Sequence, residues 1–171
     1  MSSKIVMIRP TEKFAVSWGD EFEAIPLNEE HKTEIAHFYH RTSAPLYHKP
    51  SGGNLEESLY DIERYFDYHS KKSPYKSRYQ LFLDASTLVY DKRTQLLVAL
   101  CLMAGSDTEG HIFNIFVDSS YRRRGLATNM IKRALTVYAD EYSHIDLETE
   151  KDNPARLLYE KLGFVTIGDI E

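Results

Sequence analysis

A basic turn lies where a predicted strand passes into a predicted helix. Three successive arginines at 122–124 and then Gly125 follow an apolar strand that ends at Val117, and a helical pattern begins near Ala127. The first turn of a helix exposes unpaired N–H groups and carries about half a positive charge, so backbone amides gathered there bind phosphate oxygens. Gly125 and Ala127 have little or no side chain, which lets a ligand reach the backbone. The pattern indicates a phosphate site, although a solvated surface turn explains most arginine runs that carry a single glycine.

A second pattern, near the C-terminus, combines a capping sequence with an aromatic-rich helix. It reads Asn153-Pro-Ala155, two further residues, and then Leu-Tyr-Glu-Lys-Leu-Gly-Phe over 158–164. By itself the pattern predicts an amphipathic helix over 154–162 that ends at Gly163. Tyr159 would then be an aromatic residue of the core or of its rim.

Together the two patterns resemble the GCN5-related N-acetyltransferase (GNAT) family. The strand and turn of that family read Val, then Arg or Gln, two residues, Gly, one residue, and Gly or Ala. Those positions are filled here by Val117, Arg122, Gly125 and Ala127. The later pattern of the family is matched by Asn153, Ala155 and residues 158–164. The resemblance covers about residues 86–167.

This resemblance implies an α/β (α+β) fold, with a mixed, splayed central β-sheet flanked by helices. Acetyl-CoA would enter between the strands at 111–117 and 143–149, and its pantetheine would pair with the first of them as an added strand does. Family geometry assigns the N–H of Ile115 to the thioester carbonyl and the N–H of Val117 to the pantetheine. Asn153 would lie beside the pantetheine arm. The other implied cofactor-binding residues surround the pyrophosphate or the sulfur: Arg122, Arg123, Arg124, Gly125, Leu126, Ala127, Thr128 and Tyr159.

Direct transfer of an acyl group from sulfur to an amine needs a base, an oxyanion donor and an acid. A primary amine with a pKa near ~10.4 must lose a proton before it attacks at neutral pH. The developing oxyanion needs a fixed donor, for which the N–H of Ile115 is the candidate. The leaving thiolate can take a proton from a phenol, whose pKa is about 10. The family resemblance implies that Tyr159 is this phenol.

The base is less well defined than the other two groups. His111 lies eleven positions before Arg122, where several members of the family carry a glutamate base, and an imidazole can act directly or through water. Strand alternation predicts that His111 shares a face with every second residue up to Val117, unless a bulge of the kind common in this family resets the parity. A structural role for His111 stays open. The alternative bases are Glu109, Asn114 and Glu148.

Alternating strands and helices must position these residues. Strands are predicted at 4–9, 13–18, 21–25, 86–90, 95–104, 111–117, 143–149 and 164–167. Asn28 is a predicted N-cap, Asn54 with Glu57 resembles a capping box, and residues 127–138 have an amphipathic helical period. The family usually ends in two strands, whereas only one is expected here. An N-terminal strand, from this chain or from the partner in a homodimer, is expected to cover the exposed sheet edge.

Composition favours a single domain over 1–171, in which 1–25 are N-terminal strands and 86–167 form the acetyl-CoA-binding core. The net charge of −5 disfavours nucleic-acid and anionic-membrane binding, which both need a basic surface. Cys101 is the single cysteine, which rules out an internal disulfide and a multi-cysteine zinc site. No metal is expected, and the histidines at 31, 37, 40 and 48 are expected to be solvated or hydrogen-bonded. No secretion signal or membrane span is recognisable, so a cytoplasmic location is expected.

Two functions are compatible with this sequence. The leading hypothesis is an acetyl-CoA-dependent N-acetyltransferase that acts on a primary amine of a small molecule or peptide. The alternative is a non-catalytic acyl-CoA-binding sensor, because the phosphate-binding features would persist without turnover. Seven of the twelve tyrosines lie between Tyr39 and Tyr79, among several acids, and an aromatic and acidic wall suits a cationic acceptor.

Overall fold

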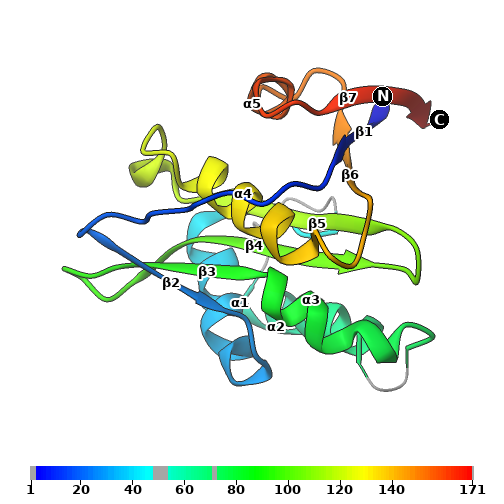
Figure 1. The fold of residues 1–171 in the computed structure, drawn as a ribbon. Coiled ribbons are helices and arrows are strands. Elements are labelled where there is room, and N and C mark those ends of the chain that lie inside the picture. Colours follow the sequence, from blue (N-terminus) through cyan, green and yellow to red (C-terminus); the bar gives the residue numbers. More distant parts are fainter. Residues whose placement is uncertain (1–2, 48–53, 71–72, 171) are drawn as a thin grey trace.

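The computed structural model describes residues 3–47, 54–70 and 73–170, and within these ranges seven strands form one open mixed sheet (Figure 1). The sheet order is β2-β3-β4-β5-β6-β1-β7. The strands are β1 (Lys4–Pro10), β2 (Phe22–Pro26), β3 (Thr87–Asp91), β4 (Leu97–Gly105), β5 (Gly110–Val117), β6 (His144–Glu150) and β7 (Val165–Ile170). Only β5 and β6 run parallel to each other, and all other neighbours are antiparallel.

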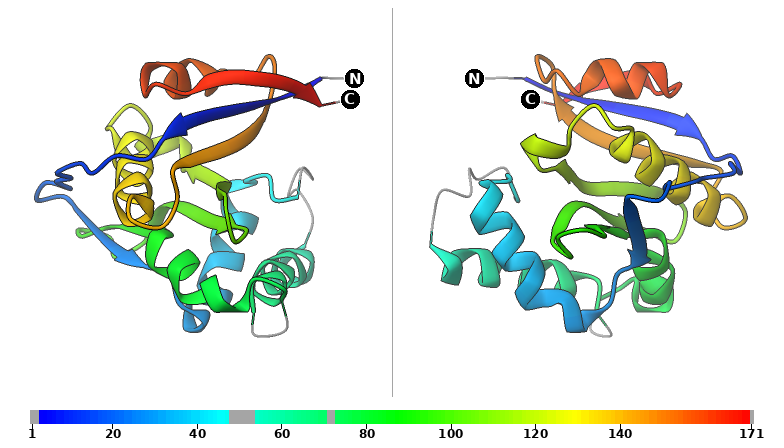
Figure 2. Two further views of the ribbon diagram at one scale, coloured as in Figure 1. Left: turned by 45° about the vertical axis from the view of Figure 1, so that its right-hand side comes forward. Right: turned by 90° about the vertical axis from the view of Figure 1, so that its left-hand side faces the viewer.

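Helices cover both faces of the sheet, as the two views in Figure 2 show. The helices are α1 (Lys32–Thr42), α2 (Leu55–Tyr68), α3 (Tyr79–Ala85), α4 (Leu126–Tyr138) and α5 (Arg156–Lys161). Single 3-10 turns lie at Glu29–His31, Lys76–Arg78 and Ser119–Tyr121. Residues of α4 pack in one apolar core with the sheet, and residues of α1 and α2 pack in a second core on the other face. β4 is buried along almost its whole length, since it has a core on each face.

The two predicted N-caps are confirmed. The side chain of Asn28 accepts a hydrogen bond from the N–H of Glu30 at 2.8 Å, and that of Asn54 accepts one from the N–H of Glu57 at 2.9 Å. Each side chain satisfies one N–H group that a helix start leaves unpaired. The amphipathic period of α4 is also confirmed, because its apolar stripe is buried against the sheet.

The N-terminal strand β1 occupies an inner position of the sheet. It pairs antiparallel with β6 on one side and with β7 on the other, so that Lys4 lies opposite both Glu150 and Ile170. The chain therefore supplies from its own N-terminal segment the strand that borders β6, and β7 forms the sheet edge.

The strand predicted at residues 13–18 is wrong. Residues 11–18 have no regular secondary structure and cross α4 on the way from β1 to β2 (Figure 1). Their polar groups bond to α4 instead of to a strand: the N–H of Phe14 donates to Thr136 Oγ1 at 2.9 Å, and Asn129 Nδ2 donates to Ser17 O at 3.1 Å. We call residues 11–21 the strap.

The short helix α3 has no counterpart among the predicted elements. It is seven residues long and its N-cap residue, Arg78, makes no side-chain capping bond. Phe82 and Ala85 bury it against the core that contains α4. Tertiary packing therefore stabilises α3, although its local sequence contains only weak signals for a helix. None of the helices in the three described ranges is both long and apolar enough to cross a bilayer.

Candidate active site

The sheet opens between its two parallel strands. β5 and β6 pair over only three positions, Gly110 with Ile145, His111 with Asp146 and Ile112 with Leu147. Beyond Ile112 the strands part, so the second half of β5 has β4 on one side and no described strand on the other.

Two backbone donors of β5 face this opening. The N–H of Asp118 donates to Val98 O in β4 at 2.8 Å. N–H groups alternate in direction along a strand, so those of Val117 and Ile115 point away from β4, toward the side where β6 has departed. These are the two N–H groups that the family resemblance implies for the pantetheine and the thioester carbonyl.

A bulge in β5 changes which side chains share a face. The register with β4 shifts between Leu102, opposite Asn114, and Met103, opposite Ile112, which leaves Phe113 as an extra residue. Ile112 and Ile115 therefore lie in the core with α4, while Phe113 lies in the core with α1 and α2. Simple alternation is wrong here because a bulge adds one residue and resets the parity.

The turn before α4 presents backbone amides to solvent. Arg123 has a φ of +63° and Gly125 a φ of +78°, and Gly125 is the N-cap of α4. The N–H of Asn129 makes the bond to Gly125 O, at 3.0 Å, so the N–H groups of Leu126, Ala127 and Thr128 have no partner in their own helix. A Cβ added at Gly125 would meet no atom within 4 Å. The open space and the free donors fit a phosphate group.

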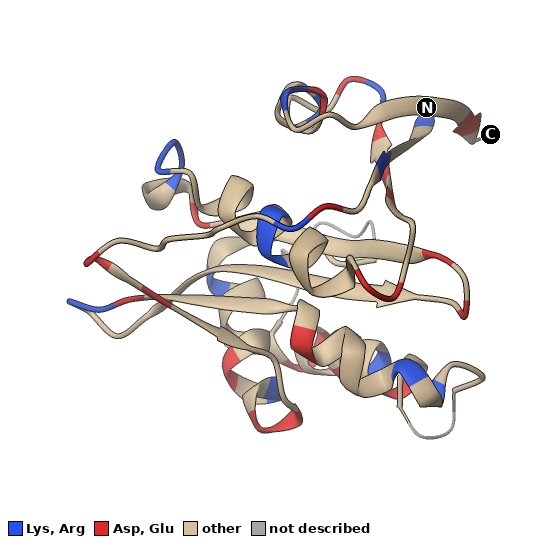
Figure 3. Ribbon diagram, viewed as in Figure 1, with Lys and Arg blue, Asp and Glu red and all other residues tan. Residues whose placement is uncertain are grey.

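The three arginines lie together on the loop that leads into α4 (Figure 3). Their side chains are exposed, and two of the three are held by the protein. Arg122 Nε donates to Val117 O at 3.2 Å, and Arg124 lies 3.6 Å from Glu21. Arg122 also stacks over Phe116, with its guanidinium carbon 5.4 Å from the ring centroid. Arg123 makes no hydrogen bond or ion pair within the described residues. The turn is thus fixed by Arg122 and Arg124, and Arg123 remains available to an anion.

Asn153 and Tyr159 lie on the other side of the opening, on or beside α5. Asn153 donates from Nδ2 to Thr149 Oγ1 at 3.0 Å and accepts from the N–H of Ala155 at 2.9 Å, which ties the end of β6 to the start of α5. Tyr159 is 7% exposed, and its hydroxyl has no hydrogen-bond partner among the described residues. Burial raises the pKa of Tyr159 to about 12. Its phenol is therefore protonated at neutral pH and can donate to a ligand.

His111 is paired with a carboxylate that the sequence analysis did not single out. The register of β5 and β6 places His111 opposite Asp146, and Nδ1 of the histidine contacts Oδ1 of the aspartate. A hydrogen bond from Nδ1–H to Asp146 fixes the tautomer that leaves Nε2 free to accept a proton. The signal for Asp146 was available only once the parallel pairing of the two strands was known.

A cavity of about 740 Å³ borders this pair. Its ionisable lining residues are Arg64, Asp67, Glu109, Asp146, His69 and His111. Its aromatic lining residues are Tyr47, Tyr68, Tyr75 and Phe113. The guanidinium of Arg64 stacks over Tyr47 at 4.2 Å from the ring centroid and lies 3.8 Å from Asp61. Among the described residues of the lining, Asp67 and Glu109 have no side-chain ion pair or hydrogen bond, so carboxylates dominate the free charge of this described part of the lining.

The alternative bases differ in their surroundings. Asn114 accepts from Tyr39 Oη at 2.7 Å and donates to Pro45 O at 2.9 Å, so its amide anchors α1 and the chain after it. Glu148 is exposed on β6 and is not part of the cavity lining. Glu109 lines the cavity and stays an alternative to His111.

The remaining sequence candidates lie elsewhere. Cys101 is fully buried in β4, and burial raises the pKa of its thiol to about 12, which disfavours the thiolate. His31 Nδ1 accepts from the N–H of Asn28 at 3.2 Å, and His37 and His40 are exposed on α1. His48 lies outside the described residues. Within the described ranges, no three His, Cys, Asp or Glu side chains gather in a way that could hold a metal ion.

His69 makes the stability of the fold sensitive to acid. Its side chain is buried, neither ring nitrogen has a hydrogen-bond partner among the described residues, and four aromatic rings surround it with centroids 4.7 to 6.2 Å away. Burial lowers the pKa of His69 to about 4, whereas an unfolded histidine titrates near ~6.5. The unfolded chain therefore binds this proton more readily, and stability present above pH ~6.5 is lost as the pH falls toward 4. We expect a loss of about 3 kcal/mol from this residue.

Urea unfolding between pH 4 and pH 7 measures this loss. A His69→Phe variant should lose less stability over that interval than the wild type, and His37→Gln, at an exposed site, serves as the control. An equal pH dependence of His69→Phe and wild type would contradict the assignment.

Comparison with solved structures shows that this arrangement of sheet and helices is an acetyltransferase fold. A GCN5-related N-acetyltransferase from Sphaerobacter thermophilus superposes with a TM-score of 0.70 at 16% identity, over 98% of this chain and 49% of that chain. Ard1 from Thermoplasma volcanium superposes with a TM-score of 0.62 at 16% identity, over 87% of this chain and 86% of that chain. At such identities the likeness shows the fold alone.

Sequence comparison then gives the family. The model of the acetyltransferase (GNAT) family matches residues 55–164, and the chain belongs to this family of N-acetyltransferases. Human N-alpha-acetyltransferase 30 is 45% identical over 58 residues, which is 33% of this chain and 16% of that protein. An N-alpha-acetyltransferase of Saccharolobus solfataricus is 39% identical over 59 residues, 33% of this chain and 35% of that protein. The matches thus span only a sixth to a third of these curated relatives. Membership of the family implies acetyl-CoA as the cosubstrate.

Proposed function

We propose that this protein transfers an acetyl group directly from the sulfur of acetyl-CoA to a primary amine of a small molecule or peptide. The observation that carries the proposal is a juxtaposition on one strand. His111 and the free N–H of Ile115 both belong to β5, next to the opening between β5 and β6. Nδ1 of His111 is bonded to Asp146, which lies on β6. A base and an oxyanion donor are thereby presented from one rigid element, as acyl transfer requires.

The residues have distinct roles in this reaction. Acetyl-CoA supplies the activated acyl group. Amides of the turn before α4 and of the first turn of α4, from Arg123 to Thr128, hold its pyrophosphate, and the N–H of Val117 holds the pantetheine. His111 accepts a proton from the acceptor ammonium through Nε2, while Asp146 keeps Nδ1 protonated. The free amine then attacks the thioester carbon, and the N–H of Ile115 stabilises the negative charge that develops on the carbonyl oxygen.

Tyr159 completes the transfer. As the carbon–sulfur bond breaks, its hydroxyl gives a proton to the departing sulfur. The newly acetylated nitrogen releases its second proton to solvent, and Tyr159 regains one from solvent. The raised pKa keeps this proton on Tyr159 at neutral pH, so the phenol is a hydrogen-bond donor to the sulfur as negative charge develops there. Asn153 supports the same region by joining β6 to α5.

The cavity favours a positively charged acceptor. Asp67 and Glu109 carry free carboxylates, whereas the one arginine of the lining, Arg64, already lies over Tyr47 and near Asp61. Aromatic faces and carboxylates both attract ammonium groups. A cytoplasmic location and dimer formation stay predictions from the sequence.

An acceptor screen tests the proposal. Purified protein is incubated with acetyl-CoA and polyamines, amino sugars, amino acids or peptides, and free thiol is measured. We expect turnover with cationic amines. Turnover only with neutral or acidic acceptors would contradict the cationic preference, and saturable CoA binding without turnover of any acceptor would favour the sensor.

Replacing Tyr159 by phenylalanine separates turnover from binding. We expect kcat to fall by about 100-fold, because the departing sulfur loses its proton donor, while the Kd of acetyl-CoA changes by less than about twofold. Tyr138→Phe serves as the control, since the Tyr138 hydroxyl donates to Ala104 O in the core at 2.8 Å. Stopped-flow kinetics and calorimetry give the two constants. An unchanged kcat in Tyr159→Phe would remove the tyrosine from the mechanism.

A further inference from the structure

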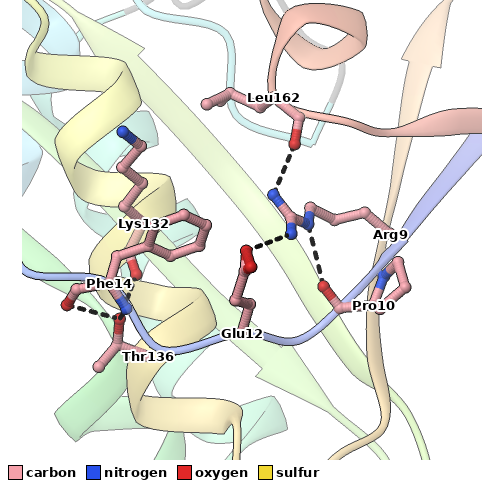
Figure 4. Close-up of polar contacts among 7 residues, drawn as sticks. All are labelled: Arg9, Pro10, Glu12, Phe14, Lys132, Thr136 and Leu162. Carbon is pink, nitrogen blue, oxygen red and sulfur yellow. Dashed lines mark hydrogen bonds and ion pairs between the residues drawn. The ribbon is translucent and has the colours of Figure 1, made fainter.

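Arg9, at the end of β1, joins three parts of the molecule (Figure 4). Its Nη1 donates to Leu162 O at 2.6 Å, its Nε to Pro10 O at 2.9 Å, and its Nη2 to Glu12 at 3.1 Å. Only 14% of its side chain is exposed. Each of the three guanidinium nitrogens therefore donates one hydrogen bond, and one of the acceptors, Leu162 O, is 153 residues away in the sequence.

The contact with Leu162 lies at the end of the helix that carries Tyr159. Leu162 is the C-cap residue of α5, and Gly163 follows it with a φ of +92°. The next residue, Phe164, donates its N–H to Tyr159 O at 3.0 Å and packs against the Tyr159 ring with centroids 6.1 Å apart. A cation at the C-terminus of a helix is favourable, because the last carbonyls lack partners there.

Helix α5 is held mainly at its two ends: Asn153 ties its start to β6, and Arg9 contacts its C-cap residue, Leu162. It is six residues long, and Tyr159 is its only buried residue. Leu157, one turn before the cap, is 65% exposed. A helix this short is not stable by itself, so its placement depends on the contacts at its ends.

The strap extends the same connection to α4. The guanidinium carbon of Arg9 lies 5.4 Å and the ammonium nitrogen of Lys132 lies 5.3 Å from the centroid of the Phe14 ring. Figure 4 shows Phe14 bonded to Thr136, a residue of α4. Arg9 thus links the helix that carries Tyr159 to the helix whose first turn carries the phosphate-binding amides.

We propose that Arg9 is a positioning residue for acetyl transfer: it holds the end of α5 so that the Tyr159 hydroxyl lies at the opening of the sheet. The inference rests on the role proposed above for Tyr159. Displacement of a reacting group by even 1 Å lowers rates strongly, so a contact three residues from Tyr159 affects turnover without touching substrate.

The test combines Arg9→Met, Arg9→Lys and Tyr159→Phe. In Arg9→Met we expect kcat about tenfold lower, with the Kd of acetyl-CoA and the KM of the acceptor within about twofold of wild type. Arg9→Lys keeps the charge and can reach one acceptor, so it should recover part of the rate, and it covers the case in which Arg9→Met fails to fold. In the Tyr159→Phe background, Arg9→Met should cause no further loss, because both changes act on the same proton transfer. Lys13→Met, which removes an exposed strap ion pair with Asp140, is the matched control.

Two results would overturn the inference: an unchanged kcat in Arg9→Met, or losses that multiply when Arg9→Met and Tyr159→Phe are combined. If the wild type turns over no amine, the proposed function fails separately, and hydrogen exchange then decides the role of Arg9. Faster exchange of the Leu162, Gly163 and Phe164 amides in Arg9→Met, with the α4 amides unchanged, supports it. Unchanged exchange at the end of α5 overturns it.

Discussion

A Gly125→Glu variant is expected to lose the thermal stabilisation that acetyl-CoA gives the wild type. At 100 times its Kd, a ligand that binds only the folded state stabilises it by about 2.7 kcal/mol. In the variant, a carboxylate would occupy the open space beside the first amides of α4 and repel the pyrophosphate. Because Gly125 has a φ of +78°, the glutamate also adds backbone strain of about 1–2 kcal/mol.

Two companion variants separate the charge from the strain. Gly125→Ala brings the same strain with one methyl group and should keep measurable binding. Gly19→Ala places an alanine at a φ of +70° in open space on the strap, so it should lower the melting temperature without changing the acetyl-CoA shift. Differential scanning fluorimetry with and without acetyl-CoA gives all four shifts. A full shift in Gly125→Glu would show that the pyrophosphate binds elsewhere.

A His111→Ala variant is expected to lower kcat by about 1,000-fold while leaving the Kd of acetyl-CoA nearly unchanged. The reason is that the acceptor ammonium then has no positioned base, whereas the amides that hold the cosubstrate belong to backbone. Asp146→Asn should cause a smaller loss, because it removes the group that orients the imidazole and retains the base itself.

Glu109→Gln decides between the two cavity candidates for the base. If His111 is the base, Glu109→Gln should raise the KM of a cationic acceptor, since it removes one attractive charge from the lining. The kcat of this variant should stay within about threefold of the wild-type value. A larger fall of kcat in Glu109→Gln than in His111→Ala would transfer the role to the glutamate.

Local patterns predicted those features of the fold that depend on nearby residues. The caps at Asn28 and Asn54, the buried strand over 95–104 and the amphipathic face of α4 each follow from spacing within a few turns of chain. The turn at Gly125 is of the same kind, because the left-handed conformation of one residue is encoded by that residue.

Features that depend on pairing between distant segments could not be predicted in this way. The bulge at Phe113 appears only when β5 is set against β4, and Asp146 becomes a candidate only when β5 is set against β6. Residues 13–18 have an alternating pattern but find side chains of α4 instead of a strand partner. The pairing partner of a segment depends on the rest of the chain, so it cannot be predicted from the sequence of that segment alone.

The position of β1 has a consequence for folding during synthesis. Both neighbours of β1 lie more than 130 residues later in the sequence, at 144–150 and 165–170, so β1 has no strand partner until those segments have been synthesised. Contacts between such remote segments carry a large loop-closure entropy and slow folding. During translation the apolar residues Ile5 and Met7, fully buried in the finished fold, would stay accessible to chaperones for longer than any other part of the core.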